Sequence, residues 1–149
     1  MSTSDVTPSA SAYSAANGSG SASAYSAANT ASYPEFKKWE DIDEMSPDLL
    51  RGIYAYGFEN PSNIQQKSIL SIIQKRDVIA QAQSGTGKTG AFTVAALQRI
   101  DVTVPKTQAL ILAPTRELAK QIHDVITGIG AMMTGLTTRL LVGGTSTAD

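Results

Sequence analysis

The sequence contains no cysteine, which excludes disulfide bonds and thiolate chemistry. It also has almost no net charge, because 12 lysines and arginines face 13 aspartates and glutamates, leaving a formal charge of −1 at pH 7. A protein with this balance has no overall electrostatic attraction for nucleic acid. Any binding of RNA or DNA must therefore come from local contacts.

Long hydrophobic runs are missing as well. No stretch approaches the roughly 20 apolar residues of a membrane-spanning helix. The start of the chain has neither the basic cluster nor the apolar core of a secretory signal, and its first basic residue is Lys37, which does not fit an arginine-rich mitochondrial presequence. We therefore expect no membrane partner and a soluble, cytoplasmic protein, with the nucleus as the alternative compartment.

The first 34 residues contain little that can form a core. They are mainly serine and alanine, carry one charged side chain (Asp5), and repeat Ser-Ala-Tyr-Ser-Ala-Ala-Asn at 11–17 and 23–29. So little bulky apolar surface cannot offset the entropy cost of ordering the chain. We expect residues 1–34 to be a disordered tail and 35–149 to fold. A tyrosine-bearing interaction arm and a phosphorylated tail are the alternatives.

Residues 78–90 read Val-Ile-Ala-Gln-Ala-Gln-Ser-Gly-Thr-Gly-Lys-Thr-Gly. A short apolar run followed by a glycine-rich loop and a helical pattern is the layout of a phosphate-binding loop. Gly85 and Gly87 permit left-handed turns that direct successive N–H groups at phosphate oxygens. Lys88 is predicted to contact the β- and γ-phosphates, and Thr89 to bind the Mg²⁺ that bridges them. These features predict a nucleotide-binding loop.

One position departs from the general pattern of such loops, which has glycine where this chain has Ala82. The alternative interpretation is a flexible Gly/Ser turn that merely contains a lysine. The strand-like run before the loop and the helical pattern after it favour nucleotide binding. Neither interpretation identifies the nucleotide.

Apolar residues recur at helical spacing in four segments, so we predict helices over about 46–57, 62–74, 87–99 and 115–133. Short apolar runs predict buried parallel strands at 78–81, 108–113 and 137–142. Alternating strands and helices indicate an α/β fold with right-handed crossovers. Ligands bind beyond the carboxyl ends of such strands, where the phosphate loop, 114–116 and 143–145 are expected to lie.

Three strands are few for such a sheet, and no carboxylate pair follows a later apolar strand to hold magnesium and position water. The chain therefore looks like the front of a domain.

Three motifs together reveal a family resemblance. Residues 57–65 read Gly-Phe-Glu-Asn-Pro-Ser-Asn-Ile-Gln, 82–89 read Ala-Gln-Ser-Gly-Thr-Gly-Lys-Thr, and 114–119 read Pro-Thr-Arg-Glu-Leu-Ala. In this order and spacing they resemble the Q motif, motif I and motif Ia of the DEAD-box RNA helicases. The glycines at 143–144 fall where that family has a glycine pair, and alanine is its usual residue at the start of motif I.

The resemblance covers about residues 36–149 and implies a P-loop NTPase fold with a RecA-like three-layer parallel sheet, here a truncated first helicase domain. It implies ATP and Mg²⁺ as cofactors and single-stranded RNA as a partner. The amino-acid sequences at 52–58, 79–89 and 108–119 look most like those of the translation-initiation branch of the family, which unwinds mRNA structure. That branch implies a scaffold protein of translation initiation as a partner, and a nuclear RNA-processing branch is the alternative.

The resemblance also implies roles at the base end of the nucleotide site. Gln65 corresponds to the glutamine that reads adenine, because its amide both donates and accepts and so rejects guanine. Phe58 and Asn60, in the same motif, are assigned to this pocket. Trp39 is the best match to an upstream aromatic that stacks on the base in relatives, with Phe36 second. The alternatives are a helix-surface role for Gln65 and a partly buried anchor for Trp39.

At the phosphate end, the resemblance assigns nucleotide contacts to Ser84, Gly85, Thr86, Gly87, Lys88 and Thr89, with Lys88 and Thr89 as the catalytic pair. RNA contacts are assigned to Pro114, Thr115, Arg116, Gly143 and Gly144. Binding through phosphate and sugar alone has no sequence preference. The alternative for Arg116 is an ion pair with a nearby carboxylate, and His123 is expected to be a surface residue.

We predict an ATP-dependent RNA helicase of the translation-initiation type. The chain has no Asp-Glu-Ala-Asp box, no Ser-Ala-Thr motif and no second domain, so by itself it is expected neither to hydrolyse ATP at a useful rate nor to unwind RNA. A non-catalytic fragment that binds nucleotide or a partner is the alternative. An unrelated P-loop ATPase or kinase is a third candidate, against which the Q motif argues.

Overall fold

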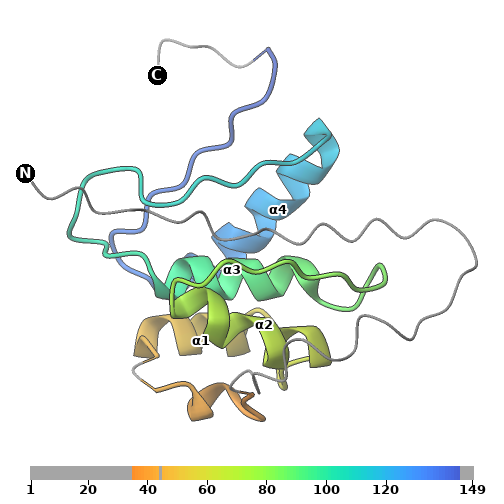
Figure 1. Ribbon diagram of the computed structural model, residues 1–149. Coiled ribbons are helices and arrows are strands. Elements are labelled where there is room, and N and C mark those ends of the chain that lie inside the picture. Colours follow the sequence, from red (N-terminus) through yellow and green to blue (C-terminus); the bar gives the residue numbers. More distant parts are fainter. Residues whose placement is uncertain (1–34, 44, 145–149) are drawn as a thin grey trace, which may run out of the picture. The chain divides into compact units, whose positions relative to one another are not determined.

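The computed structural model describes residues 35–43 and 45–144. Within that part of the chain lie α1 (Pro47–Ala55), α2 (Asn63–Ile73), α3 (Lys88–Gln98) and α4 (Arg116–Ile129), with short 3-10 turns η1 (Trp39–Asp41) and η2 (Gly130–Met132) (Figure 1). All four predicted helices are confirmed, although α4 ends earlier than predicted because the chain tightens into η2. The predictions for the tail and for Thr145 lie outside the described residues.

The core is built between helices. The aliphatic side chains with no exposed surface come from all four of them: Leu49 and Ile53 of α1, Ile69 of α2, Val94 of α3 and Ile129 of α4. Helix α2 packs along α3, while α1 contacts α3, α4 and η2. Each fully buried aliphatic side chain stabilises the fold by roughly 1.5–3 kcal/mol before its entropy cost. Tyr54, predicted on the same apolar face as Leu49, is instead 41% exposed.

Residues 35–43, which we call the aromatic strap, add their own buried side chains to this core. Phe36, Trp39 and Ile42 are 2%, 0% and 3% exposed. The Phe36 and Trp39 ring centroids lie 5.8 Å apart, with the rings tilted by 47°. The Asp41 carboxylate accepts hydrogen bonds from the backbone N–H groups of Lys38 at 2.8 Å and Lys37 at 3.0 Å. These two bonds hold the pKa of Asp41 below its ordinary value.

The three predicted strands are not formed. In the described part of the chain no residue belongs to a strand, and 78–81, 108–113 and 137–142 run as plain tubes in Figure 1. Four of their apolar side chains face solvent: Ile79, Leu110, Leu112 and Leu141 are 82%, 75%, 83% and 77% exposed. The prediction of paired strands is therefore wrong for this chain. A buried parallel strand needs ladder partners at its edges and cover on both faces, and the described neighbours do not supply them.

A groove of about 1190 Å³ opens beside these segments. Its lining combines apolar side chains of the helices, such as Ile72, Phe92 and Ile122, with Leu110 and Leu112. This volume exceeds the roughly 300–1,000 Å³ of ordinary ligand pockets. We therefore interpret the groove as the open face of the helical layer.

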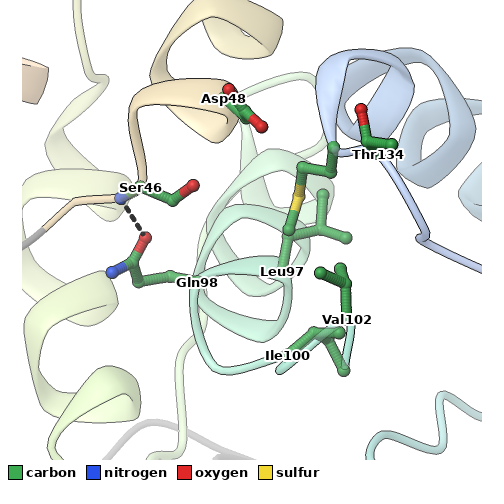
Figure 2. Close-up of a pocket in the computed structure, with 8 residues that line it drawn as sticks. Ser46, Asp48, Leu97, Gln98, Ile100, Val102 and Thr134 are labelled. Carbon is green, nitrogen blue, oxygen red and sulfur yellow. Dashed lines mark hydrogen bonds between the residues drawn. The ribbon is translucent and has the colours of Figure 1, made fainter. Parts of the chain in front are cut away.

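Helix α1 begins without a side-chain cap. Ser46 holds the N-cap position, but its hydroxyl makes no capping hydrogen bond. Its backbone N–H donates instead to Oε1 of Gln98, at the end of α3, over 3.0 Å (Figure 2). The cavity of about 100 Å³ beside this bond, lined by Asp48, Leu97 and Thr134 among others, is too small for a nucleotide. The hydrogen bond therefore serves to dock α1 on α3.

Lys75, just beyond the end of α2, has a left-handed backbone with φ 64°, the single such non-glycine residue in the described part. Glycine adopts this conformation without a Cβ penalty. We expect Lys75→Gly to stabilise the fold by about 1 kcal/mol, raising Tm by roughly 4–8 °C in a thermal melt followed by circular dichroism.

The control for this prediction is Lys67→Gly, at an exposed position within α2. It removes the same charge but adds glycine to a helix interior, so it should lower stability by about 1 kcal/mol. A lower Tm in Lys75→Gly would show that the left-handed turn is not populated.

Candidate nucleotide and RNA site

The glycine-rich loop turns as predicted. Gly85 and Gly87 have φ values of 79° and 96°, and Gly87 is the N-cap of α3. A Cβ added to Gly87 would lie 2.9 Å from both Nε2 of Gln65 and Oγ of Ser62. Glycine is therefore required here for conformation and for space. The loop leads directly into a helix N-terminus, where backbone N–H groups and the helix dipole favour an anion.

Lys88 lies inside this loop. Its ammonium donates to the carbonyl oxygen of Gln83 at 2.8 Å and also to that of Ala82. The Thr86 hydroxyl donates to the same Gln83 carbonyl at 2.7 Å. Thr89, half-buried, follows one residue later in the first turn of α3. The chain thus holds a cation and a hydroxyl side by side at the start of the helix.

Gln65 joins the Q-motif segment to the loop. Its side chain is 3% exposed, and Oε1 accepts from the backbone N–H of Ser62 at 2.8 Å while Nε2 donates to the carbonyl of Gly87 at 3.2 Å. The alternative of a helix-surface residue is therefore wrong. Both ends of the amide already have partners, so the base end and the phosphate end of the site form one connected unit.

Phe58 lies against the same helix. A Cβ added to Gly90 would be 2.7 Å from Cε2 of Phe58 and 2.7 Å from Nε2 of Gln65. The Phe58 ring meets that of Tyr56 edge to face, with centroids 5.2 Å apart. Asn60 is exposed. The structure therefore gathers Phe58 and Gln65 beside the loop and leaves Asn60 in solvent.

Trp39 takes a different position from the one predicted. Its ring has no exposed surface and packs against Phe36, and its Nε1 donates to the carbonyl of Phe58 at 3.0 Å. Phe36 is equally enclosed. Neither ring has a face open to a base, which contradicts the predicted stacking role. Trp39 is an anchor of the aromatic strap, fully rather than partly buried.

Sequence reasoning missed two residues of this cluster, Gly90 and the hydroxyl of Ser62. Gly90 lies within the first turn of α3, where glycine is costly for a helix, and that cost was the available signal. Its lack of a side chain makes room for Phe58 and Gln65. Ser62 is the N-cap of α2, where it forms a capping box with Gln65, and its buried Oγ faces Gly87.

The segment assigned to RNA lies at the start of α4. Pro114, Thr115 and Arg116 are exposed, and Thr115 Oγ1 accepts from the backbone N–H of Leu118 at 3.2 Å. Thr115 therefore caps α4, while the residue itself stays exposed. Arg116 forms no ion pair within 35–43 and 45–144, so the ion-pair alternative finds no support there.

The glycine pair approaches the same point. A Cβ added to Gly143 would lie 2.9 Å from Nη2 of Arg116, and Gly144 has φ 91°. Two turns further along α4, Nε2 of the half-buried His123 lies 3.1 Å from Oγ1 of Thr138. The structure thus brings the two predicted RNA segments together. In the described ranges no group of three or more His, Cys, Asp or Glu side chains could hold a metal, and no helix is long and apolar enough to cross a membrane.

Comparisons with known proteins bear on these motifs. The family model described as DEAD/DEAH box helicase matches residues 62–149, more than half of the chain. "ATP-dependent RNA helicase eIF4A" of Lodderomyces elongisporus is 57% identical over 112 residues, covering 75% of this chain and 28% of the relative. The protein of the same name from Neosartorya fischeri is 50% identical over 135 residues, covering 91% and 34%. The chain thus spans about a third of these relatives.

Solved structures agree. The RNA helicase Prp28 from Chaetomium thermophilum bound to ADP matches with a TM-score of 0.66 at 36% identity, covering 75% of this chain and 28% of that one. S. cerevisiae Dbp5 bound to RNA and ADP BeF3 matches with a TM-score of 0.64 at 40% identity, covering 68% and 26%. The RecA-like fold expected from the motifs is confirmed by these neighbours, and the described residues of this chain form helices of it but not its strands. The chain belongs to the DEAD/DEAH box helicase family.

Proposed function

We propose that this chain forms the adenine-nucleotide-binding part of an ATP-dependent RNA helicase of the eIF4A type, which unwinds structure in mRNA. The observation that carries the proposal is the hydrogen bond of 3.2 Å from Gln65 to the carbonyl of Gly87. It ties an amide whose second N–H and second oxygen lone pair can pair with adenine to the loop able to hold phosphates. A P-loop by itself contacts only the phosphates, so the choice of base must come from another group such as this amide.

Roles follow from position. Gln65 and Phe58 contact the base, with Asn60 beside them, and the backbone N–H groups of residues 84–87 cradle the phosphates. Lys88 exchanges the loop carbonyls it now contacts for phosphate oxygens, which are stronger acceptors because they are charged. These are the contacts that bind ATP in our proposal.

Mg²⁺ is the proposed second cofactor. Thr89 is its protein ligand in this part of the chain, and nucleotide oxygens and water complete a typical magnesium shell. When bound, the ion supplies charge that offsets the β- and γ-phosphates. Thr89, half-buried in the first turn of α3 directly after the glycine-rich loop, fits this role.

RNA is the proposed substrate and passes over the exposed start of α4. Arg116 and the Thr115 hydroxyl contact its backbone with Pro114, while Gly143 and Gly144 let the strand approach closely. The approach of Gly143 to the Arg116 guanidinium supports a single surface for these contacts. A translation-initiation scaffold protein as partner and a cytoplasmic location rest on the similarity to eIF4A proteins alone, and a nuclear role is the alternative.

A second candidate is a non-catalytic fragment that binds nucleotide or a partner without turnover. The exposed side chains of Ile79, Leu110, Leu112 and Leu141 favour it, because they lie on segments that form no strand in the described part of the chain. RNA-stimulated phosphate release separates the two candidates. We expect none from the isolated chain, and release that disappears in Lys88→Ala would show catalysis.

The proposal is tested by titrating the chain calorimetrically with Mg-ADP, Mg-ATP and Mg-GDP. A buried amide built to pair with adenine should bind Mg-ADP at least about tenfold more tightly than Mg-GDP. Gln65→Ala should abolish this preference, whereas Gln121→Ala, an exposed glutamine of α4, should keep it. Equal affinity of the wild-type chain for the two nucleotides would refute adenine recognition.

A further inference from the structure

The peptide group of Phe58 is held from two sides. Its backbone N–H donates to the carbonyl of Ile53, near the end of α1, at 3.1 Å. Its carbonyl accepts from the indole N–H of Trp39 at 3.0 Å. Because the indole ring is fully enclosed by the core, it cannot rotate away from this bond. The orientation of the Phe58 ring therefore depends on the aromatic strap.

A second tie reaches the far end of the same loop. Lys37 of the strap donates from Nζ to Oε1 of Gln66 at 3.2 Å, and Nε2 of Gln66 donates to the carbonyl of Pro61 at 2.8 Å. The strap thus fixes residues 58–61 at both ends. Trp39 acts directly on Phe58, and Lys37 acts through one intermediate side chain.

The strap has its own internal supports. The Asp41 carboxylate binds two backbone N–H groups of the strap, and the Tyr54 hydroxyl of α1 donates to the carboxylate of Glu40. This last contact raises the pKa of Tyr54 and lowers that of Glu40. None of these hydrogen bonds reaches residues 84–89, so the strap supports the base end and not the phosphate loop.

We propose that Trp39 is a positioning residue for base recognition: its indole N–H fixes the Phe58 peptide and so holds the Phe58 ring beside Gly90 and Gln65. This inference rests on the proposed function, since it assigns Phe58 to the base. It replaces direct stacking by Trp39 with an indirect role. Phenylalanine at position 39 fills most of the same space but has no donor, which isolates the contribution of the hydrogen bond.

The test separates the base from the phosphates. Affinities for Mg-ADP and for Mg-pyrophosphate are measured by calorimetry on the wild-type chain and on Trp39→Phe. We expect the variant to bind Mg-ADP three- to tenfold more weakly and Mg-pyrophosphate within twofold of wild type. A purely structural role for Trp39 would lower both affinities together or neither.

Phe36→Leu is the matched control, because Phe36 packs on Trp39 but makes no hydrogen bond to residues 58–61. The ratio of its Mg-ADP affinity to its Mg-pyrophosphate affinity should equal that of wild type. Should Trp39→Phe fail to fold, Lys37→Met replaces it, since this exposed side chain makes the tie to Gln66 and, besides it, only an exposed ion pair with Glu35. Lys37→Met is expected to lower the ratio about twofold.

An unchanged ratio in the folded variant overturns the positioning role while leaving nucleotide binding intact. A wild-type chain that binds Mg-pyrophosphate and Mg-ADP equally well overturns both base recognition and the positioning role. An equally lowered ratio of Mg-ADP to Mg-pyrophosphate affinity in Phe36→Leu would show that the effect comes from packing, and it would also overturn the proposal.

Discussion

Replacing Lys88 by alanine is expected to weaken Mg-ATP binding by about a hundredfold. Hydrogen bonds to charged groups contribute about 1.5–3 kcal/mol each, so losing one or two of them to phosphate removes one to two decades of affinity or more. The side chain is already held within the loop, where Nζ donates to the Gln83 carbonyl at 2.8 Å. Binding exchanges these carbonyl contacts for phosphate contacts, which keeps the net loss near two decades. Calorimetric titration of both chains with Mg-ATP measures the effect.

Lys120→Ala controls for charge, because Lys120 is an exposed residue of α4 and its loss changes the net charge equally. We expect its affinity to stay within twofold of wild type. The Lys88 variant should melt within a few degrees of wild type, since Gln83 is exposed and its freed carbonyl can bind water. Equal losses in the two variants would mean that the affinity reflects net charge, and full affinity in Lys88→Ala would remove the loop from the site.

The helices were predictable because their signals are local. Pro47 opens α1, Thr115 caps α4, and the apolar spacing of each helix gives the face that it buries. Strand pairing is not local. In doubly wound sheets, strands that are neighbours along the chain need not be neighbours in the sheet. The sequence of an apolar hexapeptide such as 108–113 therefore does not identify the strand with which it would pair. In the described part of the chain no residue belongs to a strand, and Leu112 is 83% exposed.

The candidate site divides in the same way. The spacing of the loop predicted the roles of Gly85, Gly87 and Lys88, because left-handed turns favour glycine and the sequence shows where the glycines are. The environment of Trp39 was not predictable, because an aromatic residue near a motif can face either a ligand or the core. In this structure the core fully encloses the Trp39 ring, and its indole N–H donates to the carbonyl of Phe58. Only the packing of the strap against α1 determines that choice.

Gly52→Ala is expected to cost about 3 kcal/mol or more of folding free energy. A Cβ at this buried position of α1 would lie 1.9 Å from the carbonyl oxygen of Ile129, which is the end of α4. The clash is with backbone, so no side-chain rotation relieves it and the two helices must separate. Overpacking of this kind usually costs 1–3 kcal/mol, and a backbone contact belongs at the upper end. Urea unfolding followed by circular dichroism measures the loss.

Gly128→Ala provides a matched control at the same contact between α1 and α4. Its added Cβ would lie 2.6 Å from two ring carbons of Tyr56, but Tyr56 is 39% exposed and can turn toward solvent. Replacing glycine inside a helix also returns roughly 0.5–1 kcal/mol, so the net change should stay below about 1 kcal/mol. Because α1 leads through Tyr56 to Phe58, a separation of the helices in Gly52→Ala should weaken Mg-ADP binding as well. Unaltered stability in Gly52→Ala would show that α1 and α4 do not approach so closely.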